Sequence, residues 1–331
     1  MAISVRDVAE RAGVSVGTVS NVLNNPERVA PATSERVLAA IEDLGFVRND
    51  AARQLRAGHS RSIGMIVLDV RNPFFTDVAR GAETTAAEAR LSVLLANSDE
   101  RADREAAYLD LFEEQRVRGI LITPVGEVVP RLEQLRSRGI PCVLVDRLAR
   151  TPGFSSVSVD DEAGGRLALE HLADVGRKHV VFVGGPFTLQ QVRDREAGAR
   201  LVAKERGIRL DVVETASLTA AEGMRAGRLL AESEEHPDAV FAANDVVALG
   251  LLQGLIQSGM RVPQDIAIIG YDDIDFAAAA TVPITSIRQP RERIGTEAVE
   301  LLLAELDGTE EPRQIVFQPE LVVRASTAAA G

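Results

Sequence analysis

Short runs of apolar residues recur along the chain from residue 62 onward, and each is followed by a stretch with apolar positions at helical spacing. The runs lie at 63–68, 91–95, 120–122, 142–145, 180–183, 240–243 and 266–269. Apolar runs of this length, bounded by Gly, Pro, Asn or Asp, are typical of strands buried on both faces of a parallel sheet. Their alternation with helices predicts a doubly wound α/β architecture, and the length of the region favours two lobes with a cleft between them.

The first 45 residues carry a different pattern, which predicts three short helices. Ser4, with an acid three positions on, forms a capping-box-like start, and Gly13 provides a C-terminal cap. Ser15 can cap a second helix, while Pro31 opens a third helix that ends at Gly45. Two short helices joined by a tight turn containing glycine are the layout of a helix-turn-helix motif. A three-helix module without a role in DNA binding is the alternative.

Polar residues gather where the predicted strands end. In open α/β sheets, ligands bind in the crevice beyond the carboxyl ends of the strands. The pattern therefore predicts a polar ligand site in the cleft between the two lobes. The strand-end residues are Asp69, Asn97, Thr123, Asp146, Asp160, Asn244 and Asp272.

The composition is that of an ordinary globular protein, with 46% hydrophobic and 26% charged residues among 331. No apolar run approaches the roughly 20 residues of a membrane helix. The amino terminus lacks the apolar core of a signal peptide, so we expect a cytoplasmic protein. The single cysteine, Cys142, excludes an internal disulfide framework and a cysteine-built zinc site. Because Cys142 lies within a predicted strand, we expect it to be a small apolar core residue.

The net charge of −12 at pH 7 argues against a nucleic-acid partner only if the charge is evenly spread. Residues 1–61 contain eight arginines and seven acidic residues, whereas the rest of the chain holds 29 basic and 42 acidic residues. The stretch 48–61 is the most basic, with four arginines and one histidine against one aspartate. The acidic excess therefore belongs to the larger region, and the basic stretch fits either DNA contact or a solvated linker.

The sequence lacks the common catalytic and metal-binding motifs. Its four histidines have no metal-ligand spacing, and it contains no Gly-x-Ser-x-Gly elbow, P-loop or Gly-x-Gly-x-x-Gly motif. One of these histidines, His171, is expected on a helix surface. The acidic cluster at 272–275 lacks the spacing of a calcium loop, although a magnesium site there stays open. We therefore expect no enzymatic activity, no metal and no cofactor, and keep a sugar-binding or sugar-converting enzyme with a DNA-binding domain as the alternative.

Two stretches of the sequence resemble a known family. Residues 7–24, DVAERAGVSVGTVSNVLN, resemble the headpiece of the lac repressor (LacI) family of bacterial transcription regulators. Residues 49–58, NDAARQLRAG, resemble the hinge helix of that family. The similarity spans essentially the whole chain, and the larger region also resembles periplasmic sugar-binding proteins of the ribose-binding type.

The resemblance implies an all-α helix-turn-helix headpiece followed by an α/β effector domain of two doubly wound parallel-sheet lobes. The headpiece would comprise residues 1–47, the hinge helix or linker 48–61, and the effector and dimerisation domain 62–331. One lobe would be formed by 62–160 with 290–318, and the other by 161–289 with 319–327.

The resemblance also implies which residues contact DNA. The helix that begins at Val16 would enter the major groove, with Val16, Gly17 and Asn21 at the base-reading positions. Gly17 has no side chain to read a base, so Asn21 is the expected hydrogen-bonding reader. Leu55 matches a leucine that relatives insert into the minor groove to bend the duplex, with a core contact of a short helix as the alternative. The other implied DNA residues are Ser15, Thr18, Ser20, Asn24 and Thr33, facing phosphates, and Asn49, Ala52 and Arg53 in the hinge.

Nine positions match residues that contact the sugar in the ribose-binding type. The hydroxyl groups of a sugar need charged or amide side chains that accept and donate hydrogen bonds, and aromatic rings suit its apolar faces. Leu218 stands where ribose binders carry an aromatic residue, which weakens the case for ribose itself. The matching residues are Asn72, Phe74, Phe75, Asp146, Arg147, Arg195, Asn244, Asp272 and Gln289.

Together these features predict a homodimeric DNA-binding transcription regulator, a repressor, that binds a near-palindromic double-stranded operator. A small sugar, a pentose or a related ribose-like molecule, would bind between the lobes and control the operator affinity. Residues 325–331 contain no leucine heptad, so we expect a dimer rather than a tetramer assembled through the tail. A corepressor-type regulator that responds to a non-sugar metabolite is the alternative, because the sequence does not determine the sign of the response.

Overall fold

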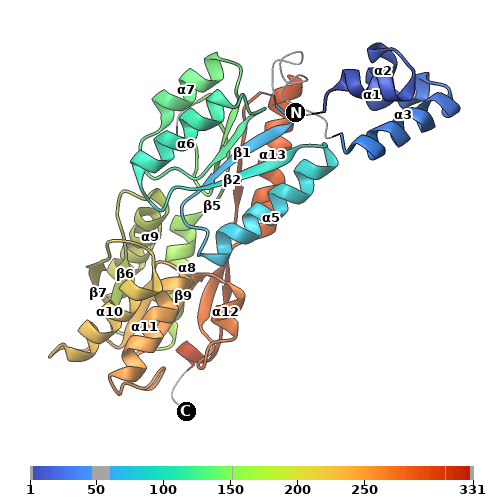
Figure 1. Ribbon diagram of the computed structural model, residues 1–331. Helices are drawn as coiled ribbons and strands as arrows, with labels where there is room; N and C mark the ends of the chain where they lie inside the picture. The colour runs from blue at the N-terminus through green and yellow to red at the C-terminus, as the bar shows by residue number, and fades with distance from the viewer. Residues whose placement is uncertain (1–2, 47–59, 151, 310, 329–331) are drawn as a thin grey trace. The chain divides into compact units, whose positions relative to one another are not determined.

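The computed structural model describes residues 3–46, 60–150, 152–309 and 311–328 of the chain. The chain forms two compact units, an amino-terminal unit, Met1–His59, and a carboxy-terminal unit, Ser60–Gly331 (Figure 1). No helix within the described ranges is both long enough and apolar enough to cross a membrane.

Helices make up the described part of the amino-terminal unit: α1 (Val5–Ala12), α2 (Val16–Asn24), the 3-10 helix η1 (Pro26–Arg28) and α3 (Pro31–Leu44). The predicted caps are confirmed. The backbone N–H of Ser4 donates to the Asp7 carboxylate at 2.7 Å, and the Ser15 hydroxyl accepts from a backbone N–H of α2 at 3.1 Å. Gly13 and Gly45 end α1 and α3 at φ angles of 65° and 60°, a region that favours a residue without a Cβ.

The helices of the amino-terminal unit pack around one apolar core. Val8, Val19 and Val37, one from each α-helix, are fully buried in it. Each helix therefore buries one face and leaves the opposite face open to solvent.

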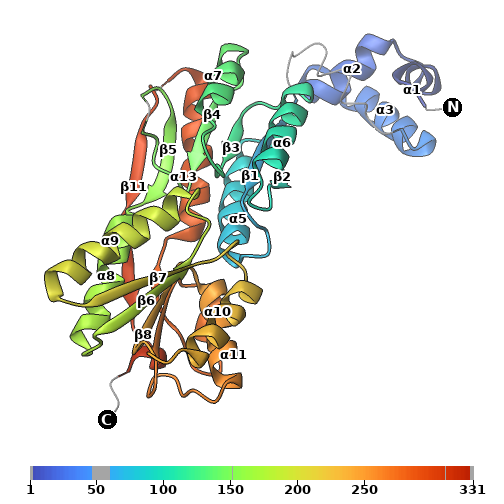
Figure 2. The same ribbon diagram turned by 90° about the vertical axis from the view of Figure 1, so that its left-hand side faces the viewer.

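Two six-stranded sheets form the centres of the two lobes of the carboxy-terminal unit (Figures 1 and 2). The strand order in the first lobe is β11 (Gln314–Phe317), β5 (Ser155–Val159), β4 (Cys142–Val145), β3 (Ile120–Ile122), β1 (Ser62–Val67) and β2 (Ser92–Asn97). The order in the second lobe is β12 (Glu320–Val322), β10 (Thr285–Arg288), β9 (Ala267–Asp272), β8 (Ala239–Ala242), β6 (His179–Gly184) and β7 (Arg209–Glu214). Neighbouring strands are parallel, except that β12 runs antiparallel to β10. The predicted α/β fold with two lobes is confirmed, and the antiparallel edge strand is an addition to it.

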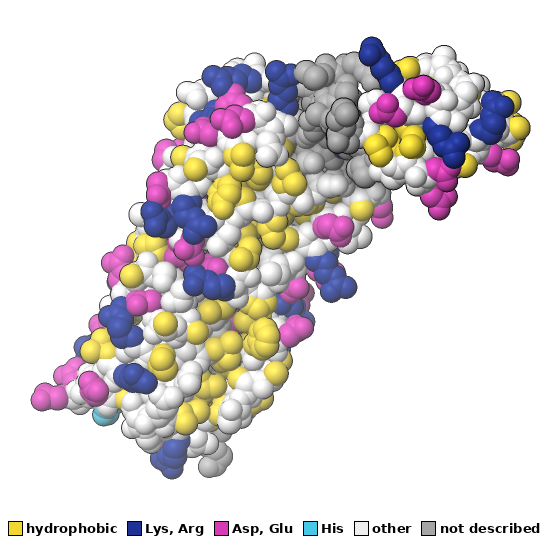
Figure 3. Space-filling view, in the orientation of Figure 1, with side chains coloured by type: hydrophobic (Ala, Val, Ile, Leu, Met, Phe, Trp, Pro, Cys, Tyr) yellow, Lys and Arg dark blue, Asp and Glu magenta, His cyan; other side chains and the backbone are white. Residues whose placement is uncertain are grey.

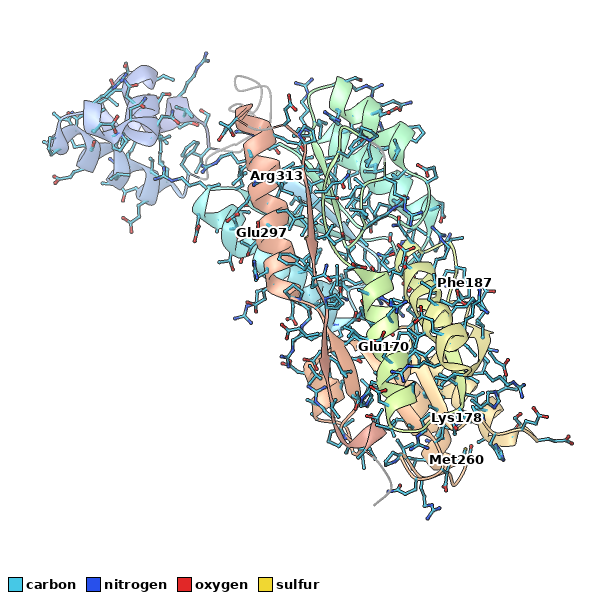
Figure 4. All side chains as sticks on the ribbon, turned by 180° about the vertical axis from the view of Figure 1, so that it is seen from behind. Glu170, Lys178, Phe187, Met260, Glu297 and Arg313 are labelled. Carbon is cyan, nitrogen blue, oxygen red and sulfur yellow. The ribbon has the colours of Figure 1, made fainter. Side chains whose placement is uncertain are left out.

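Helices cover both faces of each sheet. In the first lobe, α5 (Pro73–Glu88) and α13 (Arg291–Asp307) pack on one face, and α6 (Ala102–Glu114) and α7 (Val129–Ser137) pack on the other. In the second lobe, α8 (Asp161–Asp174) pairs with α9 (Gln190–Arg206), and α10 (Ala220–Glu232) pairs with α11 (Asp245–Gln257) on the opposite face (Figure 2). The short helices α12 (Asp275–Ala278) and η2 (Ala325–Thr327) complete this lobe. Figure 4 shows Glu297 on α13 and Glu170 on α8, one in each lobe.

The chain passes between the two lobes at three places. It crosses from β5 to α8, from β10 to α13, and from β11 to β12. The crossings are short, at residues 159–161, 288–291 and 317–320. A few residues at the ends of elements are sufficient to absorb the backbone rotation of a hinge, so a rotation of one lobe against the other would be taken up by these segments.

Helices α8 and α9 approach closely because each carries a glycine at their contact. A Cβ on Gly198 would lie 2.0 Å from the carbonyl oxygen of Glu162, and a Cβ on Gly165 would lie 2.0 Å from that of Arg195. A larger residue at either position therefore has to push the two helices apart. This close packing brings Arg195 of α9 next to Asp161 at the start of α8.

Five strands of the structure are not marked by an apolar run in the sequence: β5, β7, β10, β11 and β12. Strand β5 contains three buried serines, and the hydroxyls of two of them form hydrogen bonds. Ser155 donates to the Glu305 carboxylate, and Ser156 accepts from the backbone N–H of Ala149 at 3.1 Å. The strands β7, β11 and β12 lie at sheet edges, where one side is partly exposed and continuous apolar runs are not needed.

Two single residues were expected in opposite environments, and only one of these expectations is confirmed. Cys142 is fully buried as predicted, and burial raises the pKa of its thiol to about 12. The prediction of a surface position for His171 is wrong. Its ring is half-buried and lies 2.7 Å from the hydroxyl of Thr327, because the carboxy-terminal segment returns to α8, and burial lowers the pKa of the imidazole.

Candidate functional site

The solvent-facing side of α2 carries the residues predicted to read bases. Val16, Gly17 and Asn21 are exposed, whereas Val19 and Val22 of the same helix are buried in the core. The side chains of α2 thus divide into a face that holds the amino-terminal unit together and a face that is free to contact another molecule.

The residues predicted to face phosphates lie around this surface. Ser15 caps α2, and its hydroxyl lies 2.9 Å from that of Thr18. The Asn24 side chain donates to the carbonyl oxygen of Ser20 at 2.8 Å. Thr33 is half-buried in the first turn of α3. Hydroxyl and amide groups of this kind are common donors to phosphate oxygens.

Charge alone does not mark a DNA-binding face in the amino-terminal unit, because residues 3–46 contain four arginines and six acidic residues. The basic stretch follows them, and its predicted DNA residues Asn49, Ala52, Arg53 and Leu55 lie outside the described residues. A DNA contact through α2 would therefore depend on shape and hydrogen bonding more than on long-range attraction.

A cavity lies in the carboxy-terminal unit, with walls from both lobes. It is bounded by the loops after β1, β2 and β4 of the first lobe and by α9 and the ends of β8 and β9 of the second. This is the position expected for a ligand beyond the carboxyl ends of parallel strands. Seven of the nine predicted sugar-contacting residues line the cavity: Asn72, Phe74, Phe75, Asp146, Arg195, Asn244 and Asp272.

Arg195 is the charged centre of the wall formed by the second lobe. It is only 3% exposed, and it donates to the Asp161 carboxylate and to the carbonyl oxygen of Ala243, both at 2.8 Å. Its guanidinium carbon lies 3.7 Å from the centre of the Tyr271 ring, and its Nη1 lies 3.9 Å from the Asp272 carboxylate. Burial alone would lower the pKa of Arg195, but Asp161 and Asp272 raise it, so the side chain stays a cation in a buried site.

Asp272 connects the two lobes across the cavity. It ends β9 in the second lobe and accepts a hydrogen bond at 3.1 Å from Asn72, which caps α5 in the first lobe. Gln289 does not line the cavity but donates to the other Asp272 oxygen at 2.7 Å and so orients the carboxylate. Burial raises the pKa of Asp272 to about 6, although Arg195, Asn72 and Gln289 favour its charged form.

A second bond across the lobes joins Asp146, after β4, to Gln191 in the first turn of α9. The amide of Gln191 donates to Asp146 Oδ2 at 2.9 Å. Asp146 Oδ1 and Gln191 Oε1 are buried and have no hydrogen-bond partner among the described residues. Burial raises the pKa of Asp146 well above its usual range, against the opposing effect of Arg195. Buried polar atoms without partners are positions where a ligand or a water molecule completes the bonding.

Arg147 does not line the cavity, although the preceding residue, Asp146, does. Its guanidinium donates to the carbonyl oxygen of Gly126 and, at 3.2 Å, to Gln190. It lines a neighbouring space, together with Arg150 and Asp194. In this arrangement of the lobes, the Gln190 contact holds Arg147 away from the cavity.

Some residues of the cavity wall were not among the predicted contacts. Two of them have a weak sequence signal. Asp69 ends a predicted strand, and Glu100 follows the strand end at Asn97 by three residues. Gln191 has no such signal, since its position depends on how α9 packs against α8. The wall residues outside the predicted set are Leu68, Asp69, Glu100, Leu189, Gln191, Val192 and Leu218.

The structure gives no support for a metal site in the part of the chain that it describes. No group of three or more His, Cys, Asp or Glu side chains there is arranged to hold a metal ion. In the acidic cluster at 272–275, Asp273 is instead paired with Arg288 at 2.7 Å and with Arg324 at 2.6 Å. The Asp273 carboxylate is therefore already bound by two arginines and is not free to coordinate a magnesium ion.

The cavity combines carboxylates, a guanidinium and amides with two aromatic rings. Phe74 and Phe75 pack edge to face with ring centres 5.0 Å apart, so they provide an apolar wall beside the polar one. Such a wall can contact the C–H face of a small molecule while the polar groups accept from and donate to its hydroxyls. The arrangement is therefore suited to a small polyhydroxylated ligand.

Comparisons with known proteins follow the same division of the chain. Residues 4–49 match the family described as bacterial regulatory proteins, lacI family, and residues 169–327 match the periplasmic binding protein-like domain. The HTH-type transcriptional repressor PurR of Photobacterium profundum is 33% identical over 98% of both chains. The ribose operon repressor of Bacillus subtilis is 36% identical over 91% of this chain and 90% of that protein.

Solved structures show the same similarity. The lac repressor dimer bound to operator and the anti-inducer ONPF superposes with a TM-score of 0.87 at 28% identity, over 99% of this chain and all of that one. A LacI family transcriptional regulator from Enterococcus faecium with bound ribose superposes with a TM-score of 0.75 at 28% identity, over 82% of this chain and all of that one.

Proposed function

Since this chain belongs to the lacI family of bacterial regulatory proteins, we propose that it is a DNA-binding transcriptional repressor controlled by a small sugar bound between its two lobes. The proposed ligand class is a pentose or a related ribose-like molecule. The relatives named above are repressors, and the chain is not an enzyme, so the alternative of a sugar-converting activity is set aside.

The observation that carries the effector part of the proposal is the convergence of seven predicted contacts on one cavity. These residues come from segments as far apart in sequence as Asn72 and Asp272, and the fold brings them together across the cleft. The cavity combines a charged wall centred on Arg195 with an apolar wall of Phe74 and Phe75. A sugar satisfies both, because its hydroxyls are polar and its C–H faces are not.

The DNA part of the proposal is supported by the exposed face of α2. We propose that Val16, Gly17 and Asn21 face the bases in the major groove, with Asn21 as the hydrogen-bonding reader. The proposed phosphate contacts are Ser15, Thr18, Ser20, Asn24 and Thr33. We further propose a headpiece at 1–47, a hinge helix or linker at 48–61 with Leu55 as a minor-groove wedge, and an effector and dimerisation domain at 62–331.

We propose that the repressor acts as a homodimer on a near-palindromic operator. Hydrophobic side chains gather on the face of the carboxy-terminal unit that carries β2, α5 and α12 (Figure 3). Two apolar side chains of these elements are strongly exposed, Leu95 of β2 at 47% and Phe276 of α12 at 64%. An apolar face of this kind is suited to a second copy of the chain. Light scattering is expected to give twice the mass of one 35.5 kDa chain, and the mass of one chain would contradict the dimer.

We attribute the control of DNA binding to the hydrogen bonds that cross the cleft between the two lobes. A ligand that inserts between Asp146 and Gln191, or beside the Asn72–Asp272 bond, favours one arrangement of the lobes over another. It can change operator affinity only by the difference between its affinities for the DNA-bound and free states, and DNA changes ligand affinity by the same factor. The sign of this coupling separates an inducer from a corepressor.

The DNA part is tested by selecting preferred sequences from a random DNA library with the wild type and with Asn21→Ala. The variant should lose base preference at one position of each half-site, since one side-chain contact to a base contributes about 1–3 kcal/mol of discrimination. Asn25→Ala, at the end of the same helix and outside the proposed reading set, is the matched control and should keep the wild-type motif. An unchanged motif for Asn21→Ala removes Asn21 from the reading set, and no motif for the wild type contradicts the DNA-binding proposal.

The effector part is tested by thermal unfolding in the presence of pentoses, hexoses and nucleosides. A ligand that binds only the folded protein at 100 times its Kd adds about 2.7 kcal/mol of stability and raises the melting temperature. Asp272→Asn should lose this shift, whereas Asp275→Asn, whose side chain is 96% exposed on α12, should keep it. A shift with nucleosides and none with sugars would replace the proposed sugar by a non-sugar effector.

A further inference from the structure

Glu100 is a carboxylate of the cavity wall to which the proposed sugar site assigns no role so far. It lies between β2 and α6 in the first lobe. Its Oε1 accepts a hydrogen bond at 3.2 Å from the backbone N–H of Leu218, in the loop between β7 and α10 of the second lobe. Glu100 therefore touches both lobes and the cavity between them.

The backbone holds Glu100 in this direction. Asp99 and Glu100 are both left-handed, each with φ of 56°, which is uncommon for residues other than glycine. The turn is closed by a hydrogen bond at 3.1 Å from the Glu100 N–H to the carbonyl oxygen of Leu68, another residue of the cavity wall. Such a conformation persists only where the surrounding structure imposes it, and it is concentrated at functional sites.

The second carboxylate oxygen, Oε2, is buried and has no hydrogen-bond partner among the described residues. Arg71, the cation whose charge acts on Glu100, is already paired with Asp69 at 2.8 Å and with Asp99 at 2.9 Å. The group of the second lobe that bonds to Glu100 is the backbone N–H of Leu218, which carries no charge. A buried acceptor of this kind is costly unless a donor reaches it, and the cavity is the side from which a donor can come.

We propose that Glu100 determines the specificity of the cavity, with its Oε2 accepting a hydrogen bond from a hydroxyl group of the bound sugar. This inference rests on the proposed sugar effector and extends it. The ligand must then present a hydroxyl donor at this end of the cavity, and a phosphate or carboxylate there is rejected by Asp69, Asp99 and Glu100. The bound sugar then contacts both lobes at the point where the hydrogen bond between Leu218 and Glu100 already connects them.

Binding of this kind is coupled to a proton. Burial raises the pKa of Glu100 to about 7; the Leu218 N–H and Arg71 oppose this, while Asp69 and Asp99 add to it. A hydroxyl that donates to Oε2 favours the charged carboxylate, so ligand binding lowers the pKa and releases a proton near pH 7. If the pKa falls by two units or more, the affinity drops about tenfold between pH 8 and pH 6.

The test compares the full-length wild type with Glu100→Gln and, as a matched control, Asp99→Asn. Asp99 is the neighbouring acid, is not part of the cavity wall, and has a left-handed backbone that asparagine tolerates. The probe is D-ribose, replaced by the sugar with the largest thermal shift if another binds more tightly. Calorimetric titrations at pH 6, 7 and 8, and in two buffers of different ionisation enthalpy at pH 7, measure affinity and proton release.

The wild type should release about half a proton at pH 7 and bind about tenfold more tightly at pH 8 than at pH 6. Glu100→Gln should bind about tenfold more weakly at pH 8 and lose this proton release. Asp99→Asn keeps the Oε2 acceptor but removes a charge that adds to the raised pKa of Glu100, so it should bind as tightly as the wild type at pH 8 and still release a proton, with the midpoint of the release at a lower pH. Asp272 also titrates, with a pKa of about 6, but it is present in all three proteins, so the difference between them isolates Glu100.

Three outcomes overturn the inference, and they are distinguishable. Unchanged proton release and affinity in Glu100→Gln would remove Glu100 from ligand recognition while leaving the sugar effector intact. A lower melting temperature of Glu100→Gln with normal proton release would make its role purely structural. Absence of binding of every tested sugar to the wild type would contradict the proposed effector, and the Glu100 inference with it.

Discussion

Replacing Arg195 by methionine removes the cation that compensates buried carboxylates while keeping most of the side-chain volume. The pair formed with Asp161 is buried on both sides, with side-chain exposures of 4% and 8%, so water does not screen it. Removing one partner of a buried ion pair costs about 3–5 kcal/mol, because the other charge is left without compensation. We therefore expect Arg195→Met to lower the free energy of unfolding by about 3–5 kcal/mol at pH 8.

The loss of stability in Arg195→Met should depend on pH, because the buried carboxylates that lose their cationic partner can take up protons. Burial already raises the pKa of Asp161, and it raises that of Asp272 to about 6; without the guanidinium both rise further. A carboxyl group whose pKa is higher in the folded than in the unfolded state destabilises the fold at pH values above its folded-state pKa. Protonation of the group relieves this destabilisation as the pH falls through the folded-state pKa. The difference from the wild type should therefore shrink between pH 8 and pH 5.5, by up to about 1.4 kcal/mol per pH unit for each group that titrates.

Urea unfolding of the full chain at the two pH values measures this difference. The double variant Arg195→Met with Asp161→Asn removes one of the stranded charges and should recover about 1–2 kcal/mol at pH 8 relative to Arg195→Met. Arg200→Met, on the same helix but with a 59% exposed side chain paired to Glu196, is the control and should show no comparable loss. An equal loss at pH 8 and pH 5.5, or no recovery in the double variant, would refute the view that Arg195 acts by compensating buried carboxylates.

Further predictions concern packing, capping and reactivity. Gly198→Ala should destabilise the carboxy-terminal unit by about 1–3 kcal/mol in urea unfolding, because its Cβ would lie 2.0 Å from the Glu162 carbonyl oxygen. Gly17→Ala, where an added Cβ meets only the Ser15 hydroxyl at 3.6 Å, should instead stabilise α2 by about 0.5–1 kcal/mol, and a loss for it would contradict the packing argument. Ser15→Ala removes the cap of α2 and should lower the protection of its amides from hydrogen exchange by about 1 kcal/mol; unchanged protection would show that the cap is not needed. Cys142 should react with a thiol reagent at pH 8 only after unfolding, because its thiol is buried with a raised pKa, and rapid labelling of the native protein would contradict this.

The helices of the amino-terminal unit could be predicted because their signals are local. Ser4, Gly13, Ser15 and Gly45 act within a few residues of their own positions, where capping depends on short-range hydrogen bonds and backbone angles. The apolar runs of the sheet centres were recognisable for the same reason. Strand β5 was missed because three of its five residues are buried serines, one of which bonds to Glu305, 150 positions along the chain.

The candidate cavity was predictable only in part. The strand-end rule and the family resemblance indicated Asn72, Asp146 and Asp272, since polar residues that follow apolar runs are visible in the chain. Glu100 had only a weak signal, since it follows the strand end at Asn97 by three residues, and Gln191 had none. Their places in the wall depend on a left-handed turn after β2 and on the close approach of α8 and α9.

The sequence by itself determined the helix-turn-helix, the two-lobed α/β fold, the family and the kinds of side chain available for binding, because these follow from periodicity, caps and recognisable motifs. Only the tertiary structure decided which of those side chains face one another. Arg195 pairs with Asp161, Arg147 is held outside the cavity by Gln190, and Glu100 reaches the second lobe. The physical reason is that charge compensation, burial and the pKa shifts they cause are set by distances between groups far apart in the chain, which no local pattern records.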